Sequence, residues 1–351
     1  MKLRLPALPR PGSGLLTPGR AIALGLLIMA AAMFAAASLA TDLFLTAGGE
    51  PREAVFLVAP GESFAQVAQS LEDQGLIHDA RAFLLLAKLT GSGGRLRAGE
   101  FAVDAGWYAP RVLEQLTRGQ PILHRLQVRE GLSWWETGRL VEEAGLGSFE
   151  SFARAVRDKE LLARYNIPFD TAEGFLFPET YSLPRPADND ARPVVEAMLK
   201  EFFRVAREVW PEGLPAPAEL ARTVTLASIV EKETGQGGER TTVAGVYANR
   251  LRIGMLLQAD PTVIYGIGPS FDGNLRRADL DDTSNPYNTY RHAGLPPGPI
   301  CSPGRLSLLA AAHPEDTKFL YFVSRGDGTH VFSTNLEDHN RAVRRFQLSH
   351  H

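Results

Sequence analysis

The chain has 351 residues, of which 44% are hydrophobic and 22% are charged. This composition predicts compact domains with substantial cores and excludes an intrinsically disordered protein. A single cysteine excludes an internal disulfide and a Cys₂His₂ or Cys₄ zinc site, and the sequence predicts no metal and no cofactor. The net charge is −3, but residues 1–20 are basic and the chain from Thr41 onward carries about −7, so we expect no nucleic-acid partner.

An uncharged, apolar run at residues 21–40 follows the basic segment. The run is long enough to cross a bilayer as a helix. Because basic residues precede it and acidic residues follow it, residues 1–20 should form a cytoplasmic tail. The rest of the chain should then lie on the periplasmic or extracellular side of the inner (cytoplasmic) membrane. Ser38-Leu39-Ala40 resembles a cleavage site, but the run exceeds the roughly 7–15 apolar residues of a signal peptide, so an anchor is favoured.

An exported body excludes functions that need cytosolic ATP or NAD. The sequence agrees, because it contains neither a GxxxxGK[ST] motif nor a strand-linked GxGxxG motif. The sequence therefore predicts a function that needs no nucleotide.

A weak internal repeat follows a connector at residues 41–54. Residues 56–76 and 126–146 align without gaps at a spacing of 70 residues. Each copy reads as a strand, a glycine turn, a serine helix cap, a helix and a terminal glycine.

The first copy continues into further short elements. Helices are predicted at residues 80–89 and 110–117, with a strand between them. This arrangement indicates a small α+β module at residues 55–122, without a cluster of titratable groups that could form a catalytic centre. The second copy opens a repeat-like linking segment at residues 123–165.

The helix predicted at residues 217–235 is the most informative element. At about 100° per residue, Glu231 falls on its apolar stripe and Glu233 on its polar face. Apolar neighbours disfavour a charged carboxylate, so the pKa of Glu231 should rise towards that of a proton donor at neutral pH. The residues leave a second reading open, in which Glu231 is a structural carboxylate paired with an arginine such as Arg240 or Arg250.

This helix belongs to residues 166–349, which we predict to form a mixed α+β catalytic domain. Its polar, proline-rich stretch 281–303 has no predicted secondary structure, which favours a functional loop over a solvated surface loop. Amide and phenol side chains suit hydrogen bonding to sugars. The candidate substrate-binding residues are Gln258, Asn285, Tyr287, Asn288 and Tyr290.

Several residues read as helix caps. Asp260 before Pro261 is interpreted as the N-cap of a short helix, Ser302 as the cap of a helix at 303–312, and Asn335 as the cap of a last helix. A hairpin is expected between the last two helices.

Six ordered segments carry a resemblance to a known family. They are EGFLFPETY (173–181), LASIVEKETG (226–235), ANRLRIGMLLQADPTVIYGIG (248–268), YNTYRHAGLPPGPICSPG (287–304), AAAHPEDTKFLYFV (310–323) and HxFSTNLxxHN (330–340). With the layout of one membrane anchor and a small module ahead of a catalytic domain, the sequence resembles the endolytic murein transglycosylases of the YceG-like family over residues 21–349.

The resemblance implies a reaction and its residues. It implies that residues 55–122 form a LysM-like module and that the enzyme cleaves the β-1,4 bond between N-acetylmuramic acid and N-acetylglucosamine. The cut would leave 1,6-anhydro ends within nascent peptidoglycan glycan strands and terminate their elongation. The catalytic glutamate that the resemblance implies is the first of the VEKET segment, Glu231. Peptidoglycan synthases are candidate partners.

Two other classes of function stay open at this point. One is a non-catalytic peptidoglycan-binding scaffold of the cell-wall synthesis machinery. The other is an exported hydrolase of another type, although the chain has no GxSxG or HExxH motif and Cys301 lacks the setting of a nucleophile.

Overall fold

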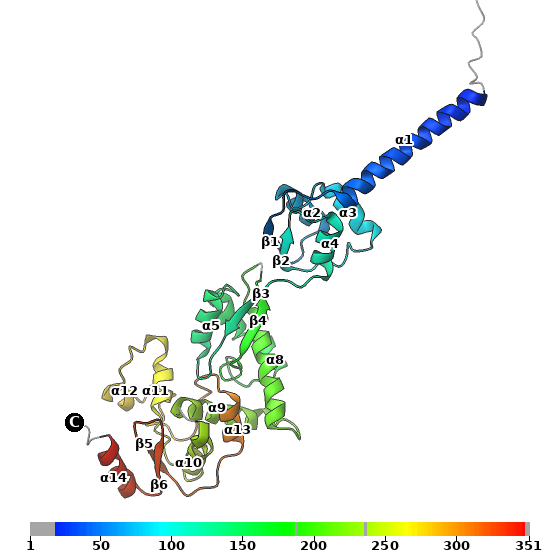
Figure 1. Ribbon diagram of the computed structural model, residues 1–351. Coiled ribbons are helices and arrows are strands. Elements are labelled where there is room, and N and C mark those ends of the chain that lie inside the picture. Colours follow the sequence, from blue (N-terminus) through cyan, green and yellow to red (C-terminus); the bar gives the residue numbers. More distant parts are fainter. Residues whose placement is uncertain (1–17, 187, 235–236, 348–351) are drawn as a thin grey trace, which may run out of the picture. The chain divides into compact units, whose positions relative to one another are not determined.

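The computed structural model describes residues 18–186, 188–234 and 237–347 (Figure 1). Most of the predicted basic tail, residues 1–17, lies outside the described residues. The chain divides into two compact units, Met1–Pro121 and Ile122–His351. Both contain helices and short antiparallel strands, which confirms a mixed α+β protein.

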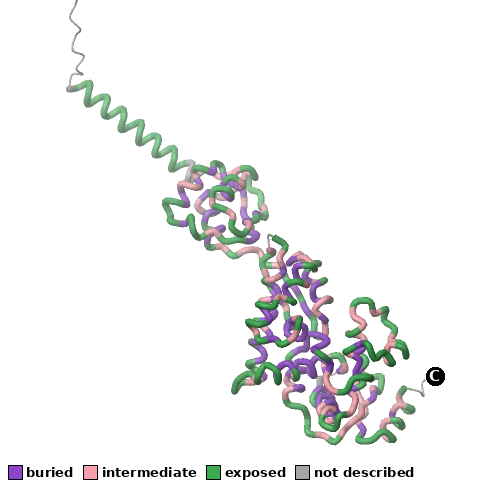
Figure 2. The backbone as a smooth tube through the Cα atoms, turned by 180° about the vertical axis from the view of Figure 1, so that it is seen from behind, coloured by how far each residue is buried: buried purple, intermediate pink, exposed green. Residues whose placement is uncertain are grey.

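The first helix, α1 (Pro18–Leu45), contains the predicted membrane segment. Its stretch Gly19–Thr41 has a mean hydropathy of 2.3, and none of it is buried in the protein (Figure 2). At 1.5 Å per residue these 23 residues span about 35 Å, which is enough for a bilayer core. The helix is therefore consistent with a single-pass anchor.

The rest of the first unit is one small α+β module. Strand β1 (Glu53–Val58) pairs antiparallel with β2 (Gly99–Asp104). The helices are α2 (Phe64–Asp73), α3 (Ala80–Leu89) and α4 (Ala109–Arg118). Phe56, Phe83 and Phe101 are fully buried in their common core. The predicted order of strand, two helices, strand and helix is confirmed, whereas the LysM-like identity of the module stays a prediction.

The two copies of the internal repeat have the same local structure. In the second copy, β3 (Leu123–Gln127) leads into α5 (Trp134–Glu143). Ser63 and Ser133 each accept a hydrogen bond from the backbone of the third helical residue, whose side chain bonds back in a capping box. Gly75 and Gly145 follow the helices with φ of 66° and 67°, a conformation that glycine adopts without strain.

The second copy is not a separate linking segment. Strand β3 pairs with β4 (Thr180–Pro184), and Leu126 and Val141 pack into the same core as the helices that follow. The predicted boundary between residues 165 and 166 is therefore not a boundary between compact units, because one hydrophobic core joins both sides.

The second unit packs most of its remaining helices around this core, to which α12 and α14 contribute no side chain among the described residues (Figures 1 and 2). The remaining helices are α6 (Phe149–Ala155), α7 (Lys159–Arg164), α8 (Arg192–Val209), α9 (Pro217–Glu233), α10 (Arg240–Arg252), α11 (Asp260–Ile267), α12 (Arg277–Asp281), α13 (Arg305–Ala312) and α14 (Leu336–Phe346). Strands β5 (Tyr321–Ser324) and β6 (His330–Ser333) form the expected hairpin. Between α12 and α13 the chain has no regular secondary structure, as predicted.

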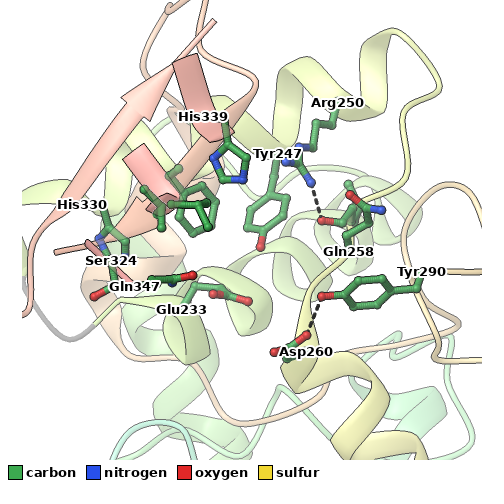
Figure 3. A pocket seen from close by; sticks show the side chains of 14 residues that line it. Glu233, Tyr247, Arg250, Gln258, Asp260, Tyr290, Ser324, His330, His339 and Gln347 are labelled. Carbon is green, nitrogen blue, oxygen red and sulfur yellow. Dashed lines mark hydrogen bonds between the residues drawn. The ribbon is translucent and has the colours of Figure 1, made fainter. Parts of the chain in front are cut away.

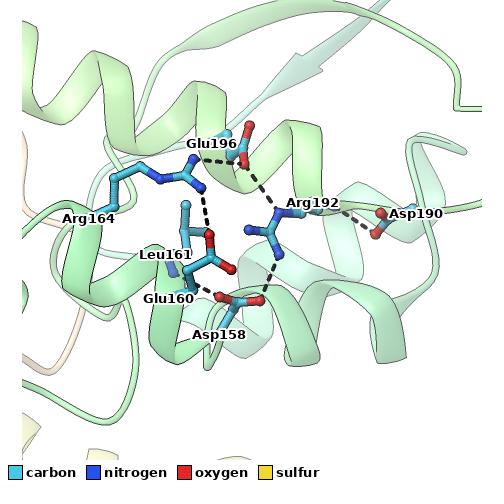
Figure 4. Close-up of polar contacts among 7 residues, drawn as sticks. All are labelled: Asp158, Glu160, Leu161, Arg164, Asp190, Arg192 and Glu196. Carbon is cyan, nitrogen blue, oxygen red and sulfur yellow. Dashed lines mark hydrogen bonds and ion pairs between the residues drawn. The ribbon is translucent and has the colours of Figure 1, made fainter.

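Ion pairs fix the start of α8 (Figure 4). The guanidinium of Arg192 lies 2.7 Å from a carboxylate oxygen of Asp158 and 3.2 Å from one of Glu196. Asp158 also caps α7 by accepting a hydrogen bond from the backbone of Leu161. These contacts join α7 to α8 and lower the pKa of Asp158, chiefly through the backbone bond from Leu161.

Of the three helix caps predicted after residue 255, one is confirmed. Asn335 accepts a hydrogen bond from the backbone of Asp338 and caps α14. Asp260 is the first residue of α11 rather than its cap, and its side chain bonds elsewhere. Ser302 is also not a cap, because α13 starts after Gly304.

Candidate active site

Helix α9 carries both glutamates of the VEKET segment near its carboxyl end. It begins with a proline in its first turn, and Leu220, Val224 and Ala227 are buried as the helical pattern predicts. The helix packs against α10, α11 and α13, so the two carboxylates at its end face different neighbours.

Glu231 lies in a polar cluster with Arg240. One carboxylate oxygen is 3.4 Å from an Arg240 nitrogen, and the other accepts a 2.9 Å hydrogen bond from the Gly304 backbone. Only 6% of the Glu231 side chain is exposed. Arg240 also lies 3.9 Å from Glu130 and donates to the Ser307 hydroxyl. Of the two arginines considered from the sequence, the structure pairs Glu231 with Arg240.

A polar cavity of about 370 Å³ lies on the other side of the α9 end (Figure 3). It is formed by α9, α10, the segment that enters α11, the β5–β6 hairpin and α14. Its polar lining residues are Glu233, Tyr247, Arg250, Gln258, Asp260, Tyr290, Ser324, His330, His339 and Gln347. Glu231 does not line this cavity.

Glu233 is the carboxyl group of α9 that faces the cavity. Burial, with a smaller contribution from the negative charge of Asp260, raises its pKa to about 7. A hydrogen bond from the Tyr247 phenol and the charge of Arg250 oppose this rise only in part. Glu233 lies on the polar face of the helix, as predicted, but α10 and the C-terminal hairpin cover that face at the helix end.

Asp260 and Tyr290 close the cavity opposite Glu233. The Tyr290 hydroxyl donates a 2.6 Å hydrogen bond to a carboxylate oxygen of Asp260. Burial and this bond raise the pKa of the Tyr290 phenol, which stays protonated. Asp260 therefore keeps a fixed position inside the cavity.

Gln258 enters the cavity from a strained backbone. Its φ is 50°, which non-glycine residues seldom adopt, and its backbone N–H donates to the Thr289 carbonyl. Arg250 supports this segment by donating to the carbonyls of Leu257 and Leu320, at 2.7 and 2.6 Å. Strain held in place by such bonds is typical of functional sites.

Two histidines complete the wall. His330 Nδ1 lies 2.7 Å from a carboxylate oxygen of Glu239, and the His330 backbone bonds the same carboxylate. Burial lowers the pKa of His339. The Nδ1 atom of His339 is buried and has no hydrogen-bond partner among the described residues. Because this nitrogen is shielded from solvent, a ligand in the cavity would meet other atoms of the His339 ring.

The structure places two of the five predicted substrate-binding residues in this cavity, Gln258 and Tyr290. Asn288 is fully buried, and its amide donates to the carbonyls of Asp279, Leu280 and Asp282. No donor of this side chain is left for a sugar. The prediction that Asn288 binds substrate is wrong, because the amide holds the loop itself together.

Asn285 has the same structural role. Its side chain donates to the Val263 carbonyl and accepts from the Tyr287 backbone, and it packs against Gly266, where any β-carbon would clash with it. Tyr287 lines a different cavity, of about 280 Å³, next to Glu173. The predicted sugar-binding loop is therefore divided between two surfaces and the interior.

The sequence pattern missed Glu233, Asp260, Tyr247 and the two histidines as members of one cavity. Asp260 was explained as a helix cap. His330 and His339 belong to the segment 330–340, which by itself indicates no site. Their nine-residue spacing indicates no common site until the hairpin and α14 fold against α10.

Comparisons with known proteins agree with this architecture. The sequence profile of the YceG-like family matches residues 56–345. An endolytic murein transglycosylase of Bacillus subtilis is 30% identical over 304 residues, covering 82% of this chain and 83% of its own length. One from Streptococcus pneumoniae is 25% identical over 317 residues, and the match spans 57% of its length. A crystal structure of a YceG-like protein of Listeria monocytogenes aligns with a TM-score of 0.54 and 26% identity, covering 84% of this chain and all of that one. The chain belongs to the YceG-like family.

Proposed function

We propose that this chain is an endolytic peptidoglycan lytic transglycosylase. The observation that carries the proposal is Glu233, a carboxyl group with a pKa of about 7 that faces a polar cavity. The family and the names of the Bacillus and Streptococcus relatives support the same activity. The bond cleaved is the β-1,4 link from N-acetylmuramic acid to N-acetylglucosamine within a nascent strand, and the cut terminates strand elongation.

Glu233 is the proposed general acid and base. As a carboxylic acid it protonates the leaving glycosidic oxygen, and as a carboxylate it then takes the proton from the C6 hydroxyl that attacks C1. The bond from C1 to the leaving oxygen breaks, and a bond from C1 to O6 forms without water. The negative charge of Asp260, held by Tyr290, favours the positive charge that develops at C1.

Gln258 and His339 are proposed to hold the muramyl ring. The reaction needs the C6 hydroxyl close to C1, and fixed polar contacts reduce the entropy cost of that geometry. Both side chains line the cavity and are themselves uncharged at neutral pH, since burial lowers the pKa of His339. They would orient the sugar without adding a charge beside Glu233.

Glu231, the glutamate selected from the sequence, is the alternative acid. Its two oxygens already bond Arg240 and the Gly304 backbone, which leaves it poorly placed to reach a glycosidic oxygen. A non-catalytic glycan-binding scaffold is the alternative function. It would use the same cavity but leave the glycan intact.

A muropeptide digest tests these assignments. Purified sacculi are incubated with the full-length protein in detergent, and the soluble fragments are separated and weighed by mass spectrometry. Internal 1,6-anhydro-muramyl ends support the proposal, reducing ends indicate a hydrolase, and an unchanged sacculus indicates a scaffold.

The location of the chain is part of the proposal. The membrane segment of α1 would anchor it in the inner membrane with residues 1–20 in the cytoplasm and the catalytic unit outside, next to peptidoglycan synthases as candidate partners. The LysM-like module would bind the glycan ahead of the catalytic unit. A reporter fused after residue 351 should then be active only outside the cytoplasm.

A further inference from the structure

A second cavity borders the candidate active site. Its volume is about 460 Å³, and it is lined by residues of α5, α9 and α11 and by the segment after α11. Lys232 and Pro261 line this cavity, whereas their chain neighbours Glu233 and Asp260 line the first one. The two cavities therefore flank the junction of α9 with α11.

The floor of this second cavity is aromatic and held in place. The rings of Trp135 and Tyr265 lie 4.8 Å apart, and Phe271 lines the same cavity. The Tyr265 hydroxyl bonds the buried carboxyl of Glu173, which also accepts a 3.0 Å hydrogen bond from the Trp134 backbone. A rigid, partly exposed aromatic surface of this kind suits the apolar face of a sugar ring.

Positive charge lies on the rim. Arg139 and Lys232 are both exposed and line the cavity, and among the described residues neither forms an ion pair. Lys232 donates to the Gly131 carbonyl at 3.2 Å. Glu136 is also present, with one carboxylate oxygen bonded by the backbone and hydroxyl of Ser133, and its single negative charge leaves the rim with a net positive charge beside Arg139 and Lys232. The rim is therefore complementary to an anion.

We infer that this second cavity is a glycan subsite for a sugar that carries a carboxylate, with the ring over Trp135 and Phe271 and the carboxylate at Arg139 and Lys232. The inference rests on the proposed function, because an enzyme that cuts inside a strand must hold sugars on both sides of the bond. A muramyl residue whose stem peptide has been removed bears such a carboxylate on its lactyl group. A muramyl residue that keeps its peptide holds this carboxyl group in an amide bond, and N-acetylglucosamine has none, so the subsite would favour a stretch of strand freed of its peptides.

Binding measurements on an inactive chain test the inference. The parent is the full-length double variant Glu231→Gln/Glu233→Gln, which cannot cut whichever glutamate is the acid. If it does not fold, the single variant, Glu231→Gln or Glu233→Gln, that fails to cut sacculi replaces it. One probe is a glycan strand freed of its peptides by an amidase, which leaves a lactyl carboxylate on every muramyl residue. The other is an uncharged chito-oligosaccharide of equal length.

Arg139→Glu should weaken binding of the anionic strand roughly tenfold at low salt, because a paired charge becomes a repulsive one. Arg139→Lys should restore most of the affinity, and high salt should reduce the difference. Phe271→Ala should weaken binding of both probes. Arg207→Glu, on an exposed position of α8 that lines neither cavity, is the matched control.

Three results would overturn the inference. They are a loss for Arg139→Glu of less than threefold on the anionic strand, an equal loss on both probes, and failure of the parent to bind the uncharged probe. Cleavage by the unsubstituted chain is measured in parallel. If that chain cuts sacculi while Arg139→Glu binds like the control, the subsite is refuted and the proposed function stands. If it does not cut them, the proposed function fails whatever the binding shows.

Discussion

Replacing each glutamate of α9 by glutamine separates the two candidate acids. Glutamine keeps the shape of the side chain but cannot donate the catalytic proton. We expect Glu233→Gln to reduce cleavage by a factor of about 10²–10⁴, the usual contribution of general acid–base catalysis. Glu231→Gln should keep most of the rate, because the amide oxygen can still accept the hydrogen bond from Gly304.

The size of the effect follows from the environment of Glu233. A carboxyl group with an ordinary pKa of 4.5 is protonated in only about 0.3% of molecules at pH 7, whereas a pKa of about 7 leaves half of them protonated. Burial in the cavity therefore supplies the acid form about 150 times more often. Glu231→Gln leaves this population unchanged and mainly removes a charge from the pair with Arg240. It should cost about 1–3 kcal/mol of stability.

The pH dependence gives an independent readout. Cleavage that needs protonated Glu233 should fall as the pH rises above about 7, by up to tenfold per unit, in both the unsubstituted chain and Glu231→Gln. For stability the sign is the same. The raised pKa means that the folded state binds a proton that the unfolded state releases above about pH 4.5, so this contribution is present at low pH and lost as the pH rises through about 7. Glu233→Gln should remove this part of the pH dependence.

The assay is release of anhydro-muropeptides from sacculi, followed by chromatography over pH 5 to 9, with circular dichroism as the control for folding. The reasoning about the cavity is refuted if Glu231→Gln abolishes cleavage in a folded protein while Glu233→Gln stays near the unsubstituted rate. That outcome would return the acid to the residue selected from the helical pattern.

Three further predictions follow from the contacts described above. Asn288→Ala should lower the stability of the second unit by about 3 kcal/mol, because three carbonyls lose their donor. The expected fall in Tm is about 6–12 °C, and an unchanged Tm would contradict the structural role. Tyr290→Phe removes the hydrogen bond that holds Asp260, so kcat should fall while Tm changes little. A fall in kcat that only accompanies a loss of Tm would argue against a role in the site. The full-length chain should stay in the membrane pellet after a high-salt wash, whereas Leu27→Arg, at the centre of α1, should shift part of it to the soluble fraction or reduce its insertion. Release of a soluble form that begins at Thr41 would show that α1 is a cleaved signal peptide.

Local structure was largely predictable because short-range rules determine it. The serine caps and terminal glycines of the internal repeat, the helix at Arg192–Val209 and the Asn335 cap all depend on residues within a few positions of one another. The pattern could not show that β3 pairs with β4 across more than 50 residues, so the second copy looked like a linker. Pairing at that distance depends on how the whole unit folds.

The site was less predictable for the same reason. A helical wheel assigns polar and apolar faces from the sequence of the helix alone. It carries no information about which other elements cover each face. Glu233 lies on the polar face, yet α10 and the hairpin bury that face at the helix end. The loop amides were not recognised as structural because their partners are backbone groups, of α11 for Asn285 and of the preceding turn for Asn288, which the sequence alone does not place beside them.

The two glutamates of α9 illustrate how neighbouring carboxyl groups take different tasks. Glu231 has a partner for each oxygen, in Arg240 and the Gly304 backbone, and Arg240 in turn reaches Glu130 on the turn before α5. This cluster ties the end of α9 to α10, α13 and the second copy of the repeat. Glu233, two residues further on, accepts a hydrogen bond from the Tyr247 phenol, and its pKa lies near neutrality. A fixed helix end with one carboxyl group bound on one side and another facing a cavity is what single-acid catalysis requires. The Gly304 hydrogen bond, which a glutamine at position 231 can still accept, and the Arg240 contacts to Glu130 and Ser307 hold this helix end together, so Glu233 should keep its orientation when the charge of Glu231 alone is removed.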